Sequence, residues 1–176
     1  NKKDIVVGCL ETPQKTTKAL FERAKQSDAT TILNTAPAIP LEPGLQELTD
    51  VVVMNEIELA MFLNQEVSND IQHITQCINR IQTHPEQIII VTLGEQGLLY
   101  YENSTASYMM GRKVEVVDTT AAGDCFVGAF ATAMSESRSV KQSLEFANIA
   151  ASISVTRLGA SSSLPLRGEV DMVISD

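Results

Sequence analysis

Long hydrophobic runs are missing from this sequence. Its apolar runs are short, such as residues 88–91, whereas a helix needs about 20 apolar residues to cross a bilayer. The first residues contain no apolar segment followed by small residues, so we expect neither a membrane span nor a signal peptide. The sequence also begins with Asn1 instead of Met, and we therefore expect it to start inside a longer protein.

Positive charge is also scarce. The chain has 13 Lys and Arg against 22 Asp and Glu, a net charge of −9. A surface that follows a nucleic-acid backbone needs clustered basic residues, so we expect no DNA or RNA partner. A single nucleotide is still compatible with this charge. Backbone N–H groups, a helix N-terminus and Mg²⁺ can hold its phosphates.

Cysteine is rare, and its spacing excludes two kinds of site. Cys9, Cys77 and Cys125 are odd in number and far apart, which matches neither a disulfide framework nor a zinc motif. We interpret them as small buried side chains in a reducing compartment and predict a cytoplasmic protein.

The sequence does contain short apolar segments that alternate with longer amphipathic ones. Its 176 residues suit one domain with a sizeable core. We expect strands at 5–10, 30–33, 51–54, 88–93 and 114–117, a hairpin at 97–101 and 107–110, and a loop at 34–44. A first helix is expected to begin at residues 12–13. Further helices are expected at 55–63, 71–81, 122–134, 140–155 and 167–174. This order predicts an α/β fold with a mostly parallel sheet and helices on both faces.

The segment after the last expected parallel strand has the composition of a phosphate site, and ligands of such sheets bind beyond the carboxyl ends of strands. It reads Asp118-Thr119-Thr120-Ala121-Ala122-Gly123-Asp124 and leads into a helix. Small residues let a phosphate approach the first-turn N–H groups, which have no intrahelical partner. Asp124 would then accept the proton of an attacking hydroxyl. The alternative is that Asp124 only caps the helix.

Two other strand ends carry weaker motifs. Asn55 and Glu58 have the spacing of a capping box, and the same polar pair would also suit Mg²⁺ and phosphate oxygens. The sequence Thr92-Leu93-Gly94-Glu95-Gln96-Gly97 contains a Gly-x-x-Gly turn. That turn either lies beside a ligand or only precedes the hairpin. It is not a Walker A loop, because no Gly-Lys-Ser/Thr follows.

Taken in this order, these motifs resemble those of the ribokinase-like, phosphofructokinase-B-type carbohydrate kinase superfamily. The segment 118–126 is similar to its C-terminal motif, 55–58 to its Asn-x-x-Glu motif, and 92–97 to its nucleotide loop. Ala121 and the closing run 154–165 resemble the ribokinase branch in particular. The resemblance implies a three-layer α/β/α fold and ATP-dependent phosphorylation of a sugar's primary hydroxyl, with D-ribose as the first candidate.

The resemblance also implies roles for single residues. Asp124 would be the base that also contacts the sugar, and the N–H groups of Ala121, Ala122, Gly123 and Asp124 would form the anion hole. Asn55 and Glu58 would organise Mg²⁺ and phosphate oxygens. The nucleotide would contact Thr92, Leu93, Gly94, Glu95, Gln96, Gly97, Gly123 and Asn148.

Two further assignments keep an alternative open. Glu11 would reach the sugar, unless it is a solvated residue at a helix start. The resemblance also implies a K⁺ site, held mostly by backbone carbonyls. Its residues would be Asp118, Thr120, Ser154, Arg157, Gly159 and Ser163. The alternative for 157–163 is a helix end followed by a Ser-rich loop.

Members of this superfamily are longer than this chain, so we expect it to be their C-terminal portion. The missing part would hold most sugar contacts and a β-sheet lid that forms the homodimer. Two classes of function remain open, a kinase of sugars or nucleosides and a non-catalytic nucleotide-binding module.

Because lid closure excludes water from a kinase site, we predict that the isolated chain has little or no turnover with ribose and MgATP. A coupled assay of ADP release measures this directly. A rate typical of an intact enzyme would contradict the prediction.

Overall fold

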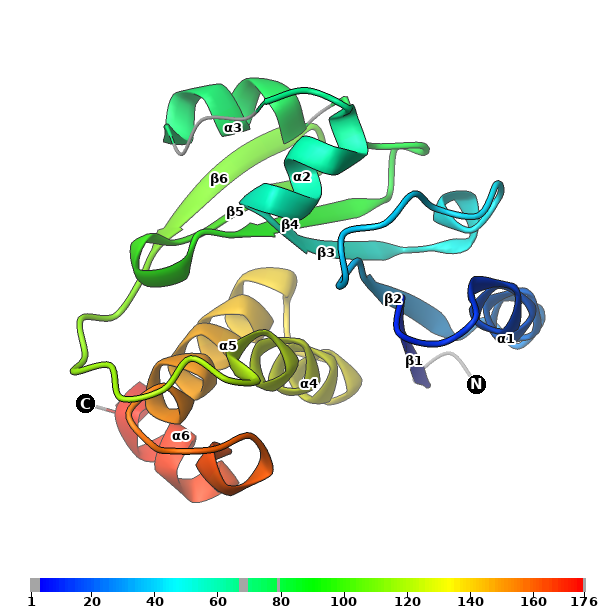
Figure 1. Cartoon of the computed structure of the whole chain (residues 1–176). Helices are drawn as coiled ribbons and strands as arrows, with labels where there is room; N and C mark the ends of the chain where they lie inside the picture. The colour runs from blue at the N-terminus through cyan, green and yellow to red at the C-terminus, as the bar shows by residue number, and fades with distance from the viewer. Residues whose placement is uncertain (1–3, 67–69, 79, 176) are drawn as a thin grey trace. The chain divides into compact units, whose positions relative to one another are not determined.

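The computed structural model describes residues 4–66, 70–78 and 80–175, and the chain forms two compact units, Asn1–Met109 and Met110–Asp176 (Figure 1). Among the described residues, no helix is long and apolar enough to span a membrane.

The first unit is built on one sheet. Its described strands follow one another in chain order: β1 (Ile5–Cys9), β2 (Thr30–Asn34), β3 (Val51–Asn55), β4 (Ile88–Thr92), β5 (Gly97–Glu102) and β6 (Thr105–Met110). The first four are parallel and β5 is antiparallel to β4. β3 and β4 are almost wholly buried, as expected for apolar strands of a parallel sheet. The predicted α/β fold with a mostly parallel sheet is confirmed.

Three helices cover one face of this sheet: α1 (Gln14–Gln26), α2 (Glu56–Leu63) and α3 (Ile71–Ile78). The strand register aligns Gly8 with Leu33, Leu33 with Val52, and Val52 with Ile89, so these residues share a face. Leu33 packs in the cluster of Phe21 from α1, whereas Val52 and Ile89 pack with α2 and α3. Because β1 to β4 run parallel, their polar C-terminal ends lie at the same edge of the sheet.

The second unit is helical. A hairpin of α4 (Ala122–Ser135) and α5 (Val140–Ser154) is followed by η3 (Ser161–Ser163) and α6 (Arg167–Ser175). Its buried cluster joins Cys125 of α4, Phe146 of α5 and Val170 of α6. The guanidinium groups of Arg138 and Arg167 each lie 4.9 Å from the centre of the Phe146 ring, a cation–π arrangement that ties α6 to the hairpin.

The predicted strand at 114–117 was wrong. Among the described residues this segment pairs with no strand, and Val116 and Val117 are each 52% exposed. The N–H groups of Val117 and Asp118 instead donate to the carbonyl of Val155, at 2.8 and 3.1 Å. Its β-branched residues favour a strand, but among the described residues no neighbouring strand offers backbone hydrogen bonds to this segment.

Close packing of α1 against β1 makes Gly8 a test of this fold. A Cβ there would lie 2.6 Å from Thr17 Cγ2 and 3.1 Å from Phe21 Cζ, so we expect Gly8→Ala to lower the free energy of unfolding by about 1–3 kcal/mol. Gly128 is the control: it lies inside α4, and a Cβ at this position would meet no atom within 4 Å. Gly128→Ala should therefore stabilise by about 0.5–1 kcal/mol. Denaturant unfolding of both variants checks this, and equal stabilities would contradict it.

Candidate functional site

The start of α4 is a helix terminus without a side-chain cap. Its N-cap residue, Ala121, has left-handed backbone angles, φ 59° and ψ 16°, and no side chain accepts from the first turn. Within the described residues, the N–H groups of Ala121, Gly123 and Asp124 have no acceptor, whereas that of Ala122 donates to the Thr119 carbonyl at 3.2 Å. Free N–H groups at the positive end of a helix dipole can bind an anion.

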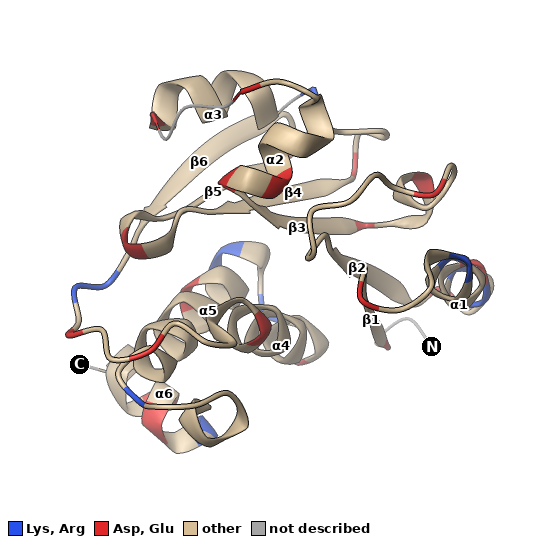
Figure 2. Cartoon of the chain, viewed as in Figure 1, with Lys and Arg blue, Asp and Glu red and all other residues tan. Residues whose placement is uncertain are grey.

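Open space adjoins this terminus. Gly123 and Asp124 are exposed, and a Cβ on Gly123 would meet no atom within 4 Å. The Asp124 carboxylate makes no hydrogen bond among the described residues. Asp124 therefore does not cap α4 by hydrogen bonding, and its carboxylate is available to an external group. Acidic residues occupy the first turns of both α2 and α4 (Figure 2).

The loop before α4 is organised around Asp118. One carboxylate oxygen, Oδ1, accepts from the Thr120 N–H at 2.9 Å and from the Thr120 hydroxyl at 2.6 Å. The other, Oδ2, accepts from the Gly159 N–H at 2.9 Å, across 41 residues of sequence. The hydroxyl of Thr120 first, and the N–H groups of Gly159 and Thr120 after it, lower the pKa of Asp118. Asp118 is therefore an ordered carboxylate that stays charged at neutral pH.

The residues predicted to bind K⁺ all lie in this second unit. Asp118 and Gly159 are in direct contact, and Ser154 and Ser163 are buried. The hydroxyls of Ser154 and Ser163 donate to the Ala151 and Ala160 carbonyls. In the described part of the chain, five of the predicted carbonyls accept no hydrogen bond, those of Asp118, Thr120, Arg157, Gly159 and Ser163. Such carbonyls, beside a carboxylate, have the chemistry that a monovalent cation needs.

A thiol lies close behind this loop. Cys125, in the first turn of α4, is buried, which raises the pKa of its thiol, and it packs in the cluster that contains Ile149 and Ala150 of α5. This packing joins the start of α4 to α5.

Asn55 and Glu58 form the capping box that their spacing predicted. The Asn55 side chain accepts from the Glu58 N–H at 2.9 Å, and Glu58 Oε2 accepts from the Asn55 N–H at 2.9 Å. Glu58 Oε1 also accepts from Asn55 Nδ2 at 3.1 Å. Oε1 accepts this single hydrogen bond and so keeps capacity for a further contact. The capping interpretation is confirmed, and the Mg²⁺ role stays a prediction.

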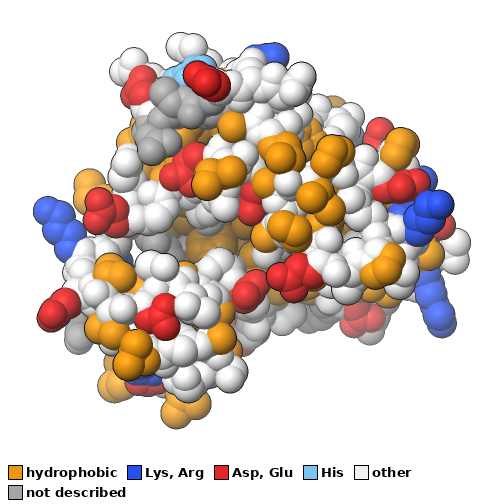
Figure 3. Space-filling view, viewed as in Figure 1, with side chains coloured by type: hydrophobic (Ala, Val, Ile, Leu, Met, Phe, Trp, Pro, Cys, Tyr) orange, Lys and Arg blue, Asp and Glu red, His pale blue; other side chains and the backbone are white. Residues whose placement is uncertain are grey.

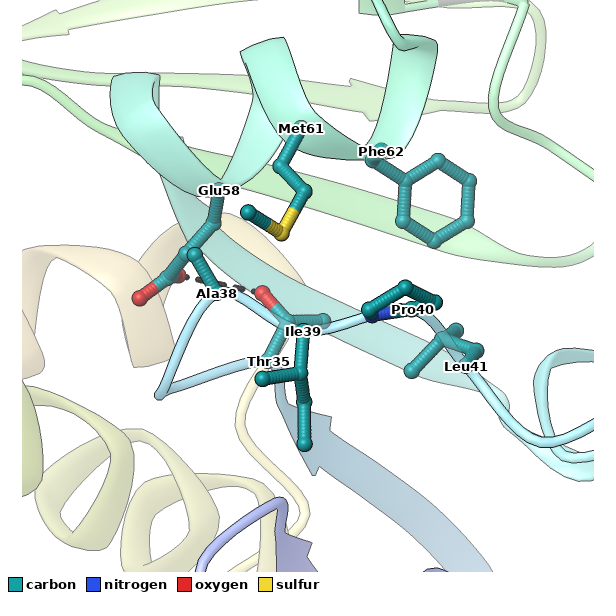
Figure 4. Close-up of a pocket in the computed structure, with 8 residues that line it drawn as sticks. All are labelled: Thr35, Ala38, Ile39, Pro40, Leu41, Glu58, Met61 and Phe62. Carbon is teal, nitrogen blue, oxygen red and sulfur yellow. Dashed lines mark hydrogen bonds between the residues drawn. The ribbon is translucent and has the colours of Figure 1, made fainter.

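Thr35 is a partner of Glu58 that the sequence analysis missed. Its hydroxyl donates to Glu58 Oε2 at 3.0 Å, and both side chains are buried (Figure 4). They lie at one end of a pocket of about 200 Å³, whose other lining residues are Ala38, Ile39, Pro40, Leu41, Met61 and Phe62. Hydrophobic side chains gather on the surface over α2 and its neighbouring loop (Figure 3). The position of Thr35 directly after β2 was a signal for this contact.

The motif at residues 92–97 forms a tight turn around η2 (Gly94–Gln96). Gly94 has φ 55°, and Gly97 has φ 104° with ψ −124°, a conformation open only to glycine. The Leu93 N–H donates to the Gly97 carbonyl at 2.8 Å. Gly94, Glu95 and Gln96 are exposed. The angles at Gly94 favour glycine and those at Gly97 require it, whether or not a nucleotide binds beside the turn.

The last two predicted residues have simpler surroundings. Glu11 is exposed in the turn after β1. Asn148, on α5, donates through Nδ2 to the Met110 carbonyl at 2.9 Å. Among the described residues, no group of three or more His, Cys, Asp or Glu side chains has the arrangement of a metal site. Glu11, Asn55, Glu58 and 92–97 belong to the first unit, and residues 118–163 to the second.

Comparison with known proteins defines the class. Residues 5–167 match the model of the pfkB family of carbohydrate kinases. The chain therefore belongs to the pfkB carbohydrate kinase family.

Its named relatives include several ribokinases. The chain is 36% identical to ribokinase from Staphylococcus aureus over 171 residues, which cover 97% of the chain and 56% of that protein. It is 34% identical to ribokinase from Haemophilus influenzae over 94% of the chain and 54% of the relative. The chain thus spans about half the length of the curated relatives that it matches.

Solved structures give the same family resemblance. A ribokinase from Thermotoga maritima matches with a TM-score of 0.86 and 33% identity, over 98% of this chain and 57% of that one. The structure of Arabidopsis thaliana ribokinase complexed with ribose and ATP matches with a TM-score of 0.91 and 28% identity, over 98% and 56%.

The hydrogen bonds to Asp118 predict a pH dependence for this loop. Its folded-state pKa is below the unfolded value of about 3.9, so the stabilisation is complete above that value and is lost as the pH falls through the folded-state pKa. We expect the amide resonances of Thr120 and Gly159 to titrate together with a midpoint below about 3.9. NMR titration measures this, Asp118→Asn should abolish the shared titration, and a midpoint above about 4 would show the prediction to be wrong.

Proposed function

We propose that this chain is the C-terminal, nucleotide-binding and catalytic portion of a cytoplasmic ribokinase that transfers the γ-phosphoryl group of ATP to D-ribose, giving ribose 5-phosphate. The observation that carries the proposal is the uncapped start of α4, with free N–H groups beside an exposed Asp124. Support for ribose comes from the ribokinases among the relatives, one of them solved with ribose and ATP.

The proposed chemistry needs two elements at the start of α4. The N–H groups of residues 121–124 would meet the charge that develops on the transferring phosphoryl group, a role for which preorganised backbone donors are effective. Asp124 would accept the proton of the sugar's primary hydroxyl as its oxygen attacks phosphorus in line. The exposed carboxylate, which is not engaged in capping, suits a base that must reach an external hydroxyl.

ATP and its cations would use the other predicted residues. The turn 92–97, Asn55, Gly123 and Asn148 would contact the nucleotide. Mg²⁺, which neutralises phosphate charge when bound, would be organised by Glu58, whose buried carboxylate is held in place by Thr35 and Asn55. K⁺ would be held by carbonyls of the 118–120 and 154–163 segments. Those of Asp118, Thr120, Arg157, Gly159 and Ser163 accept no hydrogen bond in the described structure, which suits this role.

The sugar would be recognised mainly by residues beyond this chain. Glu11 is the candidate sugar contact within it, and its exposure after β1 is compatible with that role. We propose that the remaining part of the protein supplies the other sugar contacts, the lid and a homodimer interface, because the chain covers about half of its relatives.

A second candidate is another sugar or nucleoside kinase of the same family. Fructokinase-1 from Zea mays is 32% identical over 74% of this chain, so the similarity extends to a relative named for another sugar. A non-catalytic nucleotide-binding fragment is the remaining alternative. An ADP-release screen of the full-length protein against sugars and nucleosides, with and without K⁺, separates these possibilities.

Asp124→Asn in the full-length protein tests the catalytic assignment. The amide keeps the size of the side chain but cannot act as a base, so we expect turnover to fall by about 10²–10⁴-fold while ATP binding persists. Steady-state kinetics and calorimetric titration with ATP measure the two properties. Unchanged turnover would remove Asp124 from the role of base.

A further inference from the structure

The C-terminal helix reaches back to the loop that follows α5. Glu169, in the first turn of α6, accepts from Arg157 Nη1 at 3.3 Å and also from Arg157 Nη2. The same carboxylate accepts from the Leu166 N–H at 2.7 Å. Arg157 and the Leu166 N–H lower the pKa of Glu169, so it is ionised at neutral pH and pairs with the permanently charged guanidinium.

In the sequence, Arg157 lies between Val155 and Gly159, which both form hydrogen bonds with Asp118. Two positions before it, the Val155 carbonyl accepts from the N–H groups of Val117 and Asp118. Two positions after it, the Gly159 N–H donates to Asp118 Oδ2 at 2.9 Å. The turn 155–159 therefore forms hydrogen bonds with both the backbone and the side chain of Asp118.

The backbone of this turn requires glycine at position 159. Gly159 has φ 93°, and a Cβ there would lie 2.4 Å from Ser162 Oγ. Glycine adopts such angles without strain, whereas any other residue here would be strained and would clash with Ser162. The bidentate contact between Arg157 and Glu169 is the ion pair that anchors the middle of the turn.

We propose that Glu169 is a positioning residue, which through Arg157 fixes the turn 155–159 and so sets Asp118 and the start of α4. Its catalytic consequence rests on the proposed kinase function, whereas its structural consequence does not. The side chains of Arg157 and Glu169 are 36% and 33% exposed, and such pairs add little to global stability. The effect should therefore be local order, not overall folding.

Glu169→Ala and Arg157→Ala in the full-length protein test this proposal. We expect amide hydrogen exchange in peptides covering 115–121 and 155–163 to become about three- to fivefold faster in both variants. We also expect kcat to fall by about tenfold, with little change in KM for ATP, because the reacting groups are less well placed. The double variant should be no worse than either single one, because both remove the same contact.

Two further variants separate positioning from capping and from docking of α6. Glu169→Gln keeps an acceptor for the Leu166 N–H and should fold even if Glu169→Ala does not, with partial recovery of protection. Glu136→Ala removes a different carboxylate that pairs with α6, through Arg167. It should leave exchange at 115–121 and kcat unchanged.

Each other outcome overturns the proposal. Unchanged exchange in Arg157→Ala would mean that Glu169 only caps α6. Faster exchange with unchanged kcat would mean that the turn does not set the catalytic helix start. An equal effect of Glu136→Ala would indicate general loosening of α6. If the wild-type protein shows no sugar-dependent ADP release, the proposed function fails, and the exchange measurements still test the structural claim.

Discussion

The Asp118 carboxylate is the interaction on which the second unit's candidate site depends. It accepts three hydrogen bonds, two from Thr120 and one from Gly159, and so joins the segment before α4 to the segment after α5. Both segments are irregular, and irregular backbone has no ladder of its own to hold it. A charged acceptor with several donors supplies that order at low cost, because charge-assisted hydrogen bonds are the stronger ones.

The order before α4 has a consequence for the helix itself. Ala121 adopts left-handed angles, and α4 begins without a side chain that satisfies its first N–H groups. A capped helix would be more stable, by about 1 kcal/mol, but its terminus would be closed to an anion. α5, by contrast, begins with a complete capping box at Ser139 and Gln142. α1 also begins without a side-chain cap, so the open terminus supports the proposed role of α4 together with the exposed Asp124 beside it.

In the first unit, Glu58 combines a helix-capping role with its proposed role toward Mg²⁺. Its carboxylate completes a capping box and receives the Thr35 hydroxyl, so it is held rigidly at 8% exposure. Capping does not compete with a role toward Mg²⁺, because Oε1 accepts one hydrogen bond and has a lone pair left. Structural hydrogen bonds that orient a carboxylate are what a metal-organising residue needs. The capping and functional interpretations of this motif are therefore compatible.

The sequence by itself determined the features that depend on neighbouring residues. The capping box needs only the spacing between Asn55 and Glu58, the turn 92–97 needs only glycines that tolerate its backbone angles, and buried parallel strands need only short apolar runs. Tertiary structure decided the rest: that 114–117 is not a strand, that Gly159 binds Asp118, and that Thr35 reaches Glu58. Local patterns report the preferences of a segment, whereas its partners are chosen by packing between residues far apart in the chain.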